Sequence, residues 1–230
     1  MFCGRKGVED NLLNRLIGVS LRVRPNIPFI VLNTVRRAMD SNGQSLLDVG
    51  CGDGRMIKAL LKDKKYFSVG ADIYLPSLRT CRIQKIHDGY VLSDAQNMPF
   101  KNRSFDIVLA VEIVEHLEKE EGKKAIQAWE EIARREVIIT TPVGVCPVAA
   151  KDGSPYDVHK SAWYPSEFRI LGYKVRGHGI RQMYGDSGFF NRAPKIMIPA
   201  FYILSVLVGP FVYFLPELSG RMVCIKRIIK

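Results

Sequence analysis

Short apolar runs alternate with amphipathic segments along most of this 230-residue chain. A run of apolar residues bounded by glycine or polar residues is typical of a buried strand, whereas apolar residues every three or four positions are typical of a helix. From Ser45 onward the two patterns alternate, which predicts a parallel sheet with helices on both of its faces. The predicted strands cover 46–49, 66–72, 90–93, 105–111, 137–140, 172–180 and 222–225.

The chain before this alternating region has a different pattern. Apolar residues recur at helical spacing over 8–17, and a second helix is predicted over 29–39. We therefore expect an N-terminal helical arm over residues 1–43 and one main domain over residues 44–230.

An apolar insertion over residues 181–220 separates the last two predicted strands. Residues 196–215 contain no charged side chain, and about 20 apolar residues are enough for a helix to span a bilayer. Pro199, Gly209 and Pro210 interrupt this segment, and a span would place the last strand across the membrane from its own sheet. A simple span is therefore rejected.

Two interpretations of the insertion remain open. In the first, short helices dock in a membrane interface while nearby cations face the lipid headgroups. In the second, the insertion forms an apolar lid over the functional site or a dimer interface. The cations of the first interpretation are Arg192, Lys195, Arg221, Lys226 and Arg227.

The first predicted strand runs directly into a glycine-rich turn. Gly50, Gly52 and Gly54 alternate with other residues, and glycine permits both a sharp bend and the close approach of a ligand. A dinucleotide-binding turn has the pattern Gly-x-Gly-x-x-Gly, but Arg55 stands at the third glycine position. The turn, preceded by Asp48, therefore predicts a cofactor site and disfavours NAD.

Acidic residues follow the turn at the ends of the next strands. Asp72 ends the second strand about 20 residues later, where a carboxylate can accept two hydrogen bonds from a ribose diol. Asp94 and Ala95 follow the third strand, and Glu112 opens a Glu-x-x-Glu-His-Leu segment after the fourth. Since the carboxyl ends of parallel strands share one edge of the sheet, we expect these residues to lie near one another.

These residues together resemble the class I S-adenosylmethionine-dependent methyltransferases, and most closely the subgroup called methyltransferase type 11, over roughly residues 44–180. The resemblance implies a Rossmann-like, seven-stranded, mostly parallel sheet, S-adenosyl-L-methionine as the cofactor and methyl transfer as the activity. It also implies that Asp94 takes the adenine amine and that the backbone N–H of Ala95 meets a ring nitrogen. The residues expected to bind the cofactor are Asp48, Gly50, Cys51, Gly52, Asp72, Ile73, Asp94, Ala95 and Glu112.

Two histidines are candidate catalytic residues. His116 follows the fourth strand, and His159 lies in a long loop over 143–163, within a segment that resembles the family's His-x-Ser-x-Trp pattern. Either can act as a general base if the methyl acceptor is a hydroxyl, a phenol or a carbon acid. His87 and His178 are expected to be structural or exposed.

Charge and cysteine content limit the cellular context. Five cysteines without a Cys-x-x-Cys pair predict reduced thiols, a cytoplasmic location and no zinc or other metal site. The net charge of +11 is concentrated outside the core, with +4 in residues 1–45, +2 in residues 46–180 and +5 in residues 181–230. Basic flanks fit an anionic partner, either headgroups or nucleic acid, or serve solubility.

The apolar insertion favours a hydrophobic or lipid-linked small molecule as the methyl acceptor, with peripheral contact at the inner face of a membrane through 196–215. An RNA methyltransferase is the first alternative, although the core is nearly neutral and no RNA-binding motif is present. The second alternative is a module that binds S-adenosylmethionine without catalysis.

Overall fold

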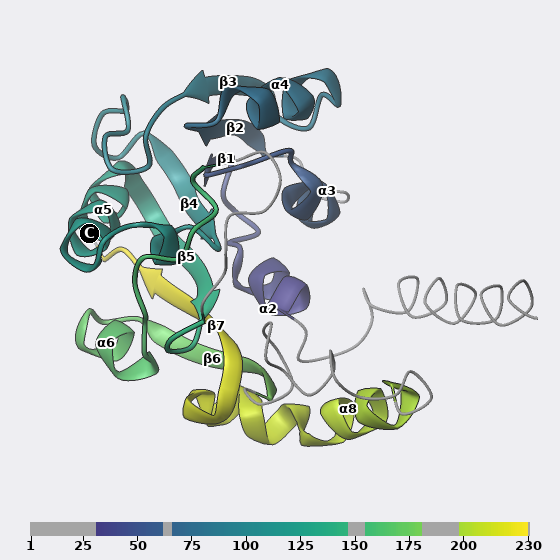
Figure 1. Ribbon diagram of the computed structural model, residues 1–230. Coiled ribbons are helices and arrows are strands. Elements are labelled where there is room, and N and C mark those ends of the chain that lie inside the picture. Colours follow the sequence, from purple (N-terminus) through teal and green to yellow (C-terminus); the bar gives the residue numbers. More distant parts are fainter. Residues whose placement is uncertain (1–30, 62–65, 147–154, 181–197, 230) are drawn as a thin grey trace, which may run out of the picture.

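The computed structural model describes residues 31–61, 66–146, 155–180 and 198–229, which surround one central sheet (Figure 1). The sheet has seven strands in the order β3-β2-β1-β4-β5-β7-β6. Neighbouring strands from β3 to β5 are parallel, whereas β7 is antiparallel to both β5 and β6. The strands are β1 (Ser45–Val49), β2 (Phe67–Asp72), β3 (Gly89–Leu92), β4 (Phe105–Val111), β5 (Ala133–Pro142), β6 (Lys174–Ile180) and β7 (Ser219–Arg227). The predicted seven-stranded, mostly parallel sheet is confirmed.

Helices connect most of these strands. The α-helices are α2 (Val31–Ala38), α3 (Arg55–Leu61), α4 (Leu75–Ile83), α5 (Lys119–Ile132), α6 (Pro165–Ile170) and α8 (Ile198–Phe214), and the short 3₁₀ helices are η2 (Val114–His116) and η5 (Pro216–Leu218). The described part of the helix predicted over 29–39 corresponds to α2. The helix predicted over 8–17 and the insertion residues 181–197 lie outside the described residues, so the predicted domain boundaries stay a prediction.

Consecutive residues of a strand pack into different apolar layers, one on each face of the sheet. This explains why helices cover both faces. Leu46 packs in a layer with Val35 of α2 and Leu60 of α3, whereas its neighbour Leu47 packs in the layer that contains Trp129 of α5. All of these side chains are nearly or completely buried. Each such apolar side chain contributes roughly 1.5–3 kcal/mol on transfer from water, so the two layers hold the sheet as a rigid platform.

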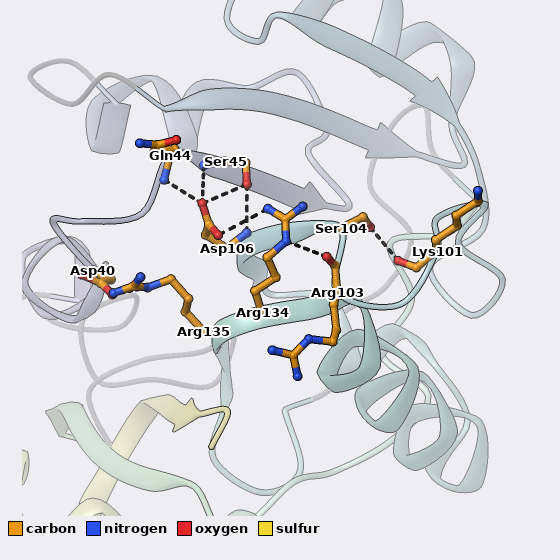
Figure 2. Close-up of polar contacts among 9 residues, drawn as sticks. All are labelled: Asp40, Gln44, Ser45, Lys101, Arg103, Ser104, Asp106, Arg134 and Arg135. Carbon is orange, nitrogen blue, oxygen red and sulfur yellow. Dashed lines mark hydrogen bonds and ion pairs between the residues drawn. The ribbon is translucent and has the colours of Figure 1, made fainter. Parts of the chain in front are cut away.

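A polar network closes the end of the sheet where β1 and β4 begin (Figure 2). The Asp106 carboxylate accepts hydrogen bonds from the backbone N–H of Gln44 at 2.8 Å and from the N–H and hydroxyl of Ser45, both at 3.1 Å. Arg134 lies 3.4 Å from the same carboxylate. Burial works to raise the pKa of Asp106, but the hydrogen bonds from Gln44 and Ser45 outweigh it, and the pKa is lowered.

The apolar helix α8 stands in the connection between β6 and β7 and contacts β6, at the side of the sheet away from β3 (Figure 1). The contact is close, because a Cβ atom at Gly177 would lie 2.3 Å from the carbonyl oxygen of Val212. None of the helices in the described part of the chain has both the length and the hydropathy needed to cross a membrane.

Two of the cations expected to face lipid headgroups have acidic partners within the protein. Lys226 donates a hydrogen bond to Glu130 at 2.6 Å, and the Arg221 guanidinium lies 3.5 Å from the Glu112 carboxylate. Both side chains therefore contact acids of the protein itself, and their contact with headgroups stays a prediction. Arg192 and Lys195 lie outside the described residues.

Candidate active site

The glycine turn lies between β1 and α3, and its glycines have different tasks. Gly50, Gly52 and Gly54 all have positive φ angles, of 67°, 54° and 79°, which favour glycine over other residues. A Cβ atom at Gly50 would lie 2.0 Å from the Ile113 side chain, so Gly50 is required for packing. A Cβ atom at Gly52 would meet no atom of the described residues within 4 Å, so Gly52 presents bare backbone to open space.

Asp72, at the end of β2, lies directly beside this turn. Its carboxylate accepts hydrogen bonds from the backbone N–H of Gly52 and of Tyr74, each at 2.7 Å. Burial raises the pKa of Asp72, and the two N–H donors oppose the increase. The adjacent Ile73 side chain is 39% exposed. The structure thus places Asp72, which was expected to meet a ribose, against the glycine turn.

Two of the expected cofactor residues lie beneath the turn instead of on its open side. The Asp48 side chain is buried, and its carboxylate is 3.2 Å from Nε2 of His87, which is also buried. Cys51 is buried as well, and burial raises the pKa of its thiol. Burial also raises the pKa of Asp48, with the His87 contact opposing it. These groups support the turn from below, and His87 is structural as expected.

The adenine-binding residues implied by the resemblance follow β3 at the same edge. Asp94 holds a tight turn, because its carboxylate accepts a hydrogen bond from the N–H of Gln96 at 2.9 Å. The carbonyl of Ala95 accepts a hydrogen bond from the indole N–H of Trp129 at 2.8 Å. Since Trp129 is part of the buried core, this bond fixes the segment after β3 to α5.

Glu112 is held in a strained backbone conformation at the end of β4. Its φ angle is +55°, a region that costs a non-glycine residue about 1 kcal/mol or more. Its carboxylate accepts a hydrogen bond from the Thr140 hydroxyl at 3.0 Å and lies 3.5 Å from Arg221. Glu112 therefore turns toward β5 and β7.

The two candidate catalytic histidines, far apart in the sequence, meet at this edge. The ring centroids of His116 and His159 are 4.8 Å apart, with the rings nearly perpendicular. Nδ1 of His116 lies 3.1 Å from the carbonyl oxygen of Val158, and Nδ1 of His159 lies 2.6 Å from that of Cys146. A carbonyl only accepts hydrogen bonds, so each Nδ1 carries a proton, and in the neutral ring Nε2 then keeps its lone pair. Burial lowers the pKa of His116, which favours the neutral ring.

Backbone hydrogen bonds hold the second histidine in place. The carbonyl of Glu115 accepts from the N–H of Lys160 at 2.8 Å and of Ser161 at 3.1 Å. The buried Trp163 donates its indole N–H to the carbonyl of Val114 at 3.2 Å. Hydrogen bonds to carbonyls of η2 therefore hold the segment that resembles His-x-Ser-x-Trp, and His159 lies against this helix.

The same loop also extends toward Asp72, beside the glycine turn. The Tyr156 ring lies 6.4 Å from the Tyr74 ring, which follows Asp72 by two residues. The described part of the predicted loop over 143–163 thus extends along the edge from Asp72 to His116.

Sequence reasoning gave no role to Glu115, which lies between Glu112 and the histidines. Its side chain is 2% exposed, and one carboxylate oxygen accepts a hydrogen bond from the Thr141 hydroxyl at 2.9 Å. Burial raises the pKa of Glu115 well above its usual value, and the nearby Glu112 adds to the increase. The Glu-x-x-Glu-His spacing was the available signal, because it places two carboxylates and an imidazole within five residues after a strand.

His178, which was expected to be structural or exposed, is buried on β6 beside α8. Its ring packs edge-on against Tyr213 at 5.7 Å. It therefore belongs to the packing between β6 and α8, away from the glycine turn on β1 in the strand order.

Comparison with known proteins agrees with this arrangement. Residues 47–139 match the family model described as a methyltransferase domain. A curated relative from Arabidopsis thaliana, named tRNA (carboxymethyluridine(34)-5-O)-methyltransferase, is 30% identical over 95 residues, which cover 40% of this chain and 21% of that protein. The chain spans only about a fifth to a quarter of the length of the curated relatives that it matches.

Solved structures share the fold over nearly the whole chain. A SAM-dependent methyltransferase from Archaeoglobus fulgidus aligns with a TM-score of 0.55 and 17% identity, covering 91% of this chain and 92% of the other. Magnesium protoporphyrin IX methyltransferase from Synechocystis, solved with bound SAM, aligns with a TM-score of 0.50 and 13% identity, covering 100% and 87%. At these identities the likeness concerns the fold.

Proposed function

We propose that this chain is a class I methyltransferase that binds S-adenosyl-L-methionine and methylates a hydrophobic or lipid-linked small molecule. One observation carries the cofactor assignment. The Asp72 carboxylate bonds the N–H of Gly52 at 2.7 Å, and a side chain at Gly52 would point into open space. A carboxylate therefore borders a stretch of bare backbone, an arrangement that suits a ribose diol with an adjoining charged group.

The described residues fit such a cofactor. Asp72 accepts the ribose hydroxyls, Asp94 accepts the adenine amine, and the N–H of Ala95 meets a ring nitrogen. Gly50, Gly52 and Cys51 supply the turn, which Asp48 supports from below. When bound, S-adenosylmethionine would supply a methyl group on a positively charged sulfur. This sulfur is a good leaving group when an acceptor atom attacks the methyl carbon in line.

The protein's main contribution to this reaction is alignment and exclusion of water, which lower the barrier by roughly 7–11 kcal/mol in well-oriented systems. The loop that carries Tyr156 and His159 extends along the edge and limits access of solvent. Nε2 of His116 and Nε2 of His159 keep lone pairs toward the acceptor side, where they handle the proton of an acceptor hydroxyl. A hydroxyl or phenol is therefore the acceptor group that these residues suit best.

The acceptor class is supported by the outer face of α8. Along one side of this helix, Leu207, Phe211 and Phe214 are 67%, 68% and 63% exposed. Contiguous exposed apolar side chains mark contact with another apolar surface, and we assign that surface to a lipid layer that supplies the acceptor. The opposite side of the helix is packed, since Val212 is buried.

Liposome flotation tests this assignment. We expect the protein to float with vesicles of mixed neutral and anionic lipid, and the double variant Leu207→Glu, Phe211→Glu to remain in the aqueous fraction. Ile170→Glu is the matched control, because Ile170 is also strongly exposed but lies on α6. Equal flotation of the double variant and the wild type would remove the support for a lipid-linked acceptor.

RNA is the second candidate acceptor. The Arabidopsis relative is named as a tRNA methyltransferase, and the net charge of +11 suits a polyanion. Incubation with methyl-labelled S-adenosylmethionine and either lipid extract or total RNA separates the candidates. Label in the lipid fraction supports the proposal, whereas label in RNA, with binding that weakens steeply with salt, replaces it by RNA methylation.

A further inference from the structure

We propose that Glu115, His116 and His159 bind a divalent transition-metal ion, of the class of Zn²⁺ or Mn²⁺, on the acceptor side of the site. One candidate ligand atom from each residue lies within 4.8 Å of the other two. The sequence predicted no metal site, because that prediction rested on cysteine spacing. The ion's role in methyl transfer rests on the proposed function, but its binding can be measured separately.

The histidines are already arranged as metal ligands usually are. In metal sites the nitrogen that does not bind the ion commonly donates its proton to a carbonyl or carboxylate, which fixes the tautomer and the ring orientation. Here both Nδ1 atoms meet backbone carbonyls, of Val158 for His116 and of Cys146 for His159. In the neutral rings both Nε2 atoms are therefore available to an ion, and the two ring centroids lie only 4.8 Å apart.

The carboxylate gives an independent indication of a missing cation. Glu115 is almost completely buried, and its Oε1 atom has no hydrogen-bond partner among the described residues. Its other oxygen accepts a hydrogen bond from Thr141 at 2.9 Å. A buried carboxylate oxygen without a partner is costly. An ion bound between Glu115 and the two imidazoles would satisfy this oxygen, while Thr141 orients the ligand.

The ligand set also indicates which ions fit. Two imidazoles and one carboxylate suit zinc, manganese and iron better than calcium, which prefers oxygen ligands only. Ligands of one such ion are about 2.0–2.2 Å from it and so roughly 3–4 Å from one another. The candidate ligand atoms lie within 4.8 Å of one another, so a small adjustment of the side chains, with both Nδ1 hydrogen bonds kept, brings them to this spacing. Three protein ligands leave coordination positions free for an acceptor oxygen, as in catalytic sites.

The cluster adjoins the glycine turn. A Cβ atom at Gly50 would collide with the Ile113 side chain, and Ile113 precedes η2, which contains Glu115 and His116. The metal ligands and the cofactor turn are thus parts of one edge, joined by direct packing.

This location defines what the ion would do. A hydroxyl bound to a divalent metal loses its proton at a lower pH than a free hydroxyl. The proton passes to solvent, the acceptor oxygen forms the new O–CH₃ bond, and the S–CH₃ bond breaks with its electron pair going to sulfur. We therefore infer an acceptor with a hydroxyl or phenol group, and ligand roles for His116 and His159 in place of separate general-base roles.

Metal titration of protein that has been stripped with EDTA tests the site directly. We expect Zn²⁺ or Mn²⁺ to bind by calorimetry at one ion per chain, and Co²⁺ to give a visible absorption spectrum of nitrogen and oxygen ligation. His159→Ala and Glu115→Gln should each weaken binding at least tenfold. S-adenosylhomocysteine titrations on the same samples should stay near wild type, because the hydrogen bonds of both side chains go to residues outside the glycine turn.

A second cluster supplies the matched control. Cys51, Cys81 and His87 also lie within 4.8 Å of one another, all of them buried. Cys81→Ala should keep the ion if it binds at Glu115. Absence of metal binding in the wild type, or loss of the ion only in Cys81→Ala, would overturn the inference. Retained S-adenosylhomocysteine binding would leave the proposed function standing in either case.

Discussion

The two ends of the central sheet treat their carboxylates in opposite ways. Where β1 and β4 begin, Asp106 receives hydrogen bonds from Gln44 and Ser45, and its pKa is lowered (Figure 2). Where β2 and β4 end, burial raises the pKa of Asp72 and of Glu115. Hydrogen bonds within the chain thus stabilise the charged form of Asp106, whereas Oε1 of Glu115 has no hydrogen-bond partner among the described residues. The first arrangement fits a structural role, and the second fits the binding role proposed for this edge, because perturbed pKa values cluster at functional sites.

The largest expected effect is on ligand affinity, at the end of the sheet that carries Asp72. Asp72→Ala removes the acceptor for ribose hydroxyls, and hydrogen bonds to a charged group are worth about 1.5–3 kcal/mol. We therefore expect S-adenosylhomocysteine to bind about 10–100-fold more weakly. Calorimetric titration measures this, with thermal unfolding on the same sample to show that the variant is folded. An unchanged dissociation constant would contradict the assigned role of Asp72.

Removal of the Asp106 carboxylate, at the other end of the sheet, should lower stability and leave ligand affinity unchanged. Asp106→Ala leaves the N–H groups of Gln44 and Ser45 without their acceptor, so we expect a loss of about 2–3 kcal/mol in the free energy of unfolding. Affinity for S-adenosylhomocysteine should stay at the wild-type value. Urea unfolding and titration of the same variant provide both numbers. A large loss of affinity would show that the two ends are not independent.

A pair of glycine substitutions separates the effect of blocking a ligand from the effect of straining the backbone. Gly52 and Gly172 both have positive φ angles, and a Cβ atom at either would meet nothing closer than 3.6 Å. Alanine at each position should therefore cost a similar amount of stability, about 1–2 kcal/mol. Only Gly52→Ala should weaken S-adenosylhomocysteine binding, by about tenfold, because its Cβ enters the open side of the turn. Equal affinities would place the ligand elsewhere.

The pH dependence of stability provides a finer test. The folded-state pKa of Asp106 is lowered, so its contribution is present above the unfolded value of about 3.9 and is lost as the pH falls through the lower folded value. The wild type should thus be more stable than Asp106→Ala at pH 6 and approach it below about pH 3. Urea unfolding at several pH values measures the difference. A constant difference down to low pH would mean that the carboxylate charge does not matter.

The smallest effect is expected at Arg134. Its guanidinium lies 3.4 Å from Asp106, and its side chain is 45% exposed. Exposed ion pairs contribute only about 0.2–1 kcal/mol. Arg134→Ala should therefore lower the free energy of unfolding by less than 1 kcal/mol, well below the effect of Asp106→Ala. A loss equal to that of Asp106→Ala would mean that the ion pair dominates the network.

The strands could be predicted from the sequence because burial between two helical layers demands uninterrupted apolar runs. The boundary between α5 and β5 was harder to predict. The fifth strand was predicted over 137–140, but β5 begins at Ala133. Arg134 and Arg135 do not resemble a buried strand, since their side chains reach Asp106 and Asp40 at the polar end of the sheet.

The cofactor edge was predictable for a different reason. The glycine turn and Asp72 follow strands at positions that topology alone brings together. The meeting of His116 with His159 was not predictable, because it depends on hydrogen bonds from the loop backbone to the carbonyl of Glu115. The contact of Arg221 with Glu112 likewise depends on the antiparallel pairing of β5 and β7, which residue type does not reveal.

The most direct test of the account is a calorimetric titration of the wild-type protein with S-adenosylhomocysteine and, separately, with NAD. The account predicts that S-adenosylhomocysteine binds at one molecule per chain with micromolar or tighter affinity, and that NAD gives no measurable heat. Binding of NAD without binding of S-adenosylhomocysteine would contradict the assignment of the glycine edge as a methyl-donor site.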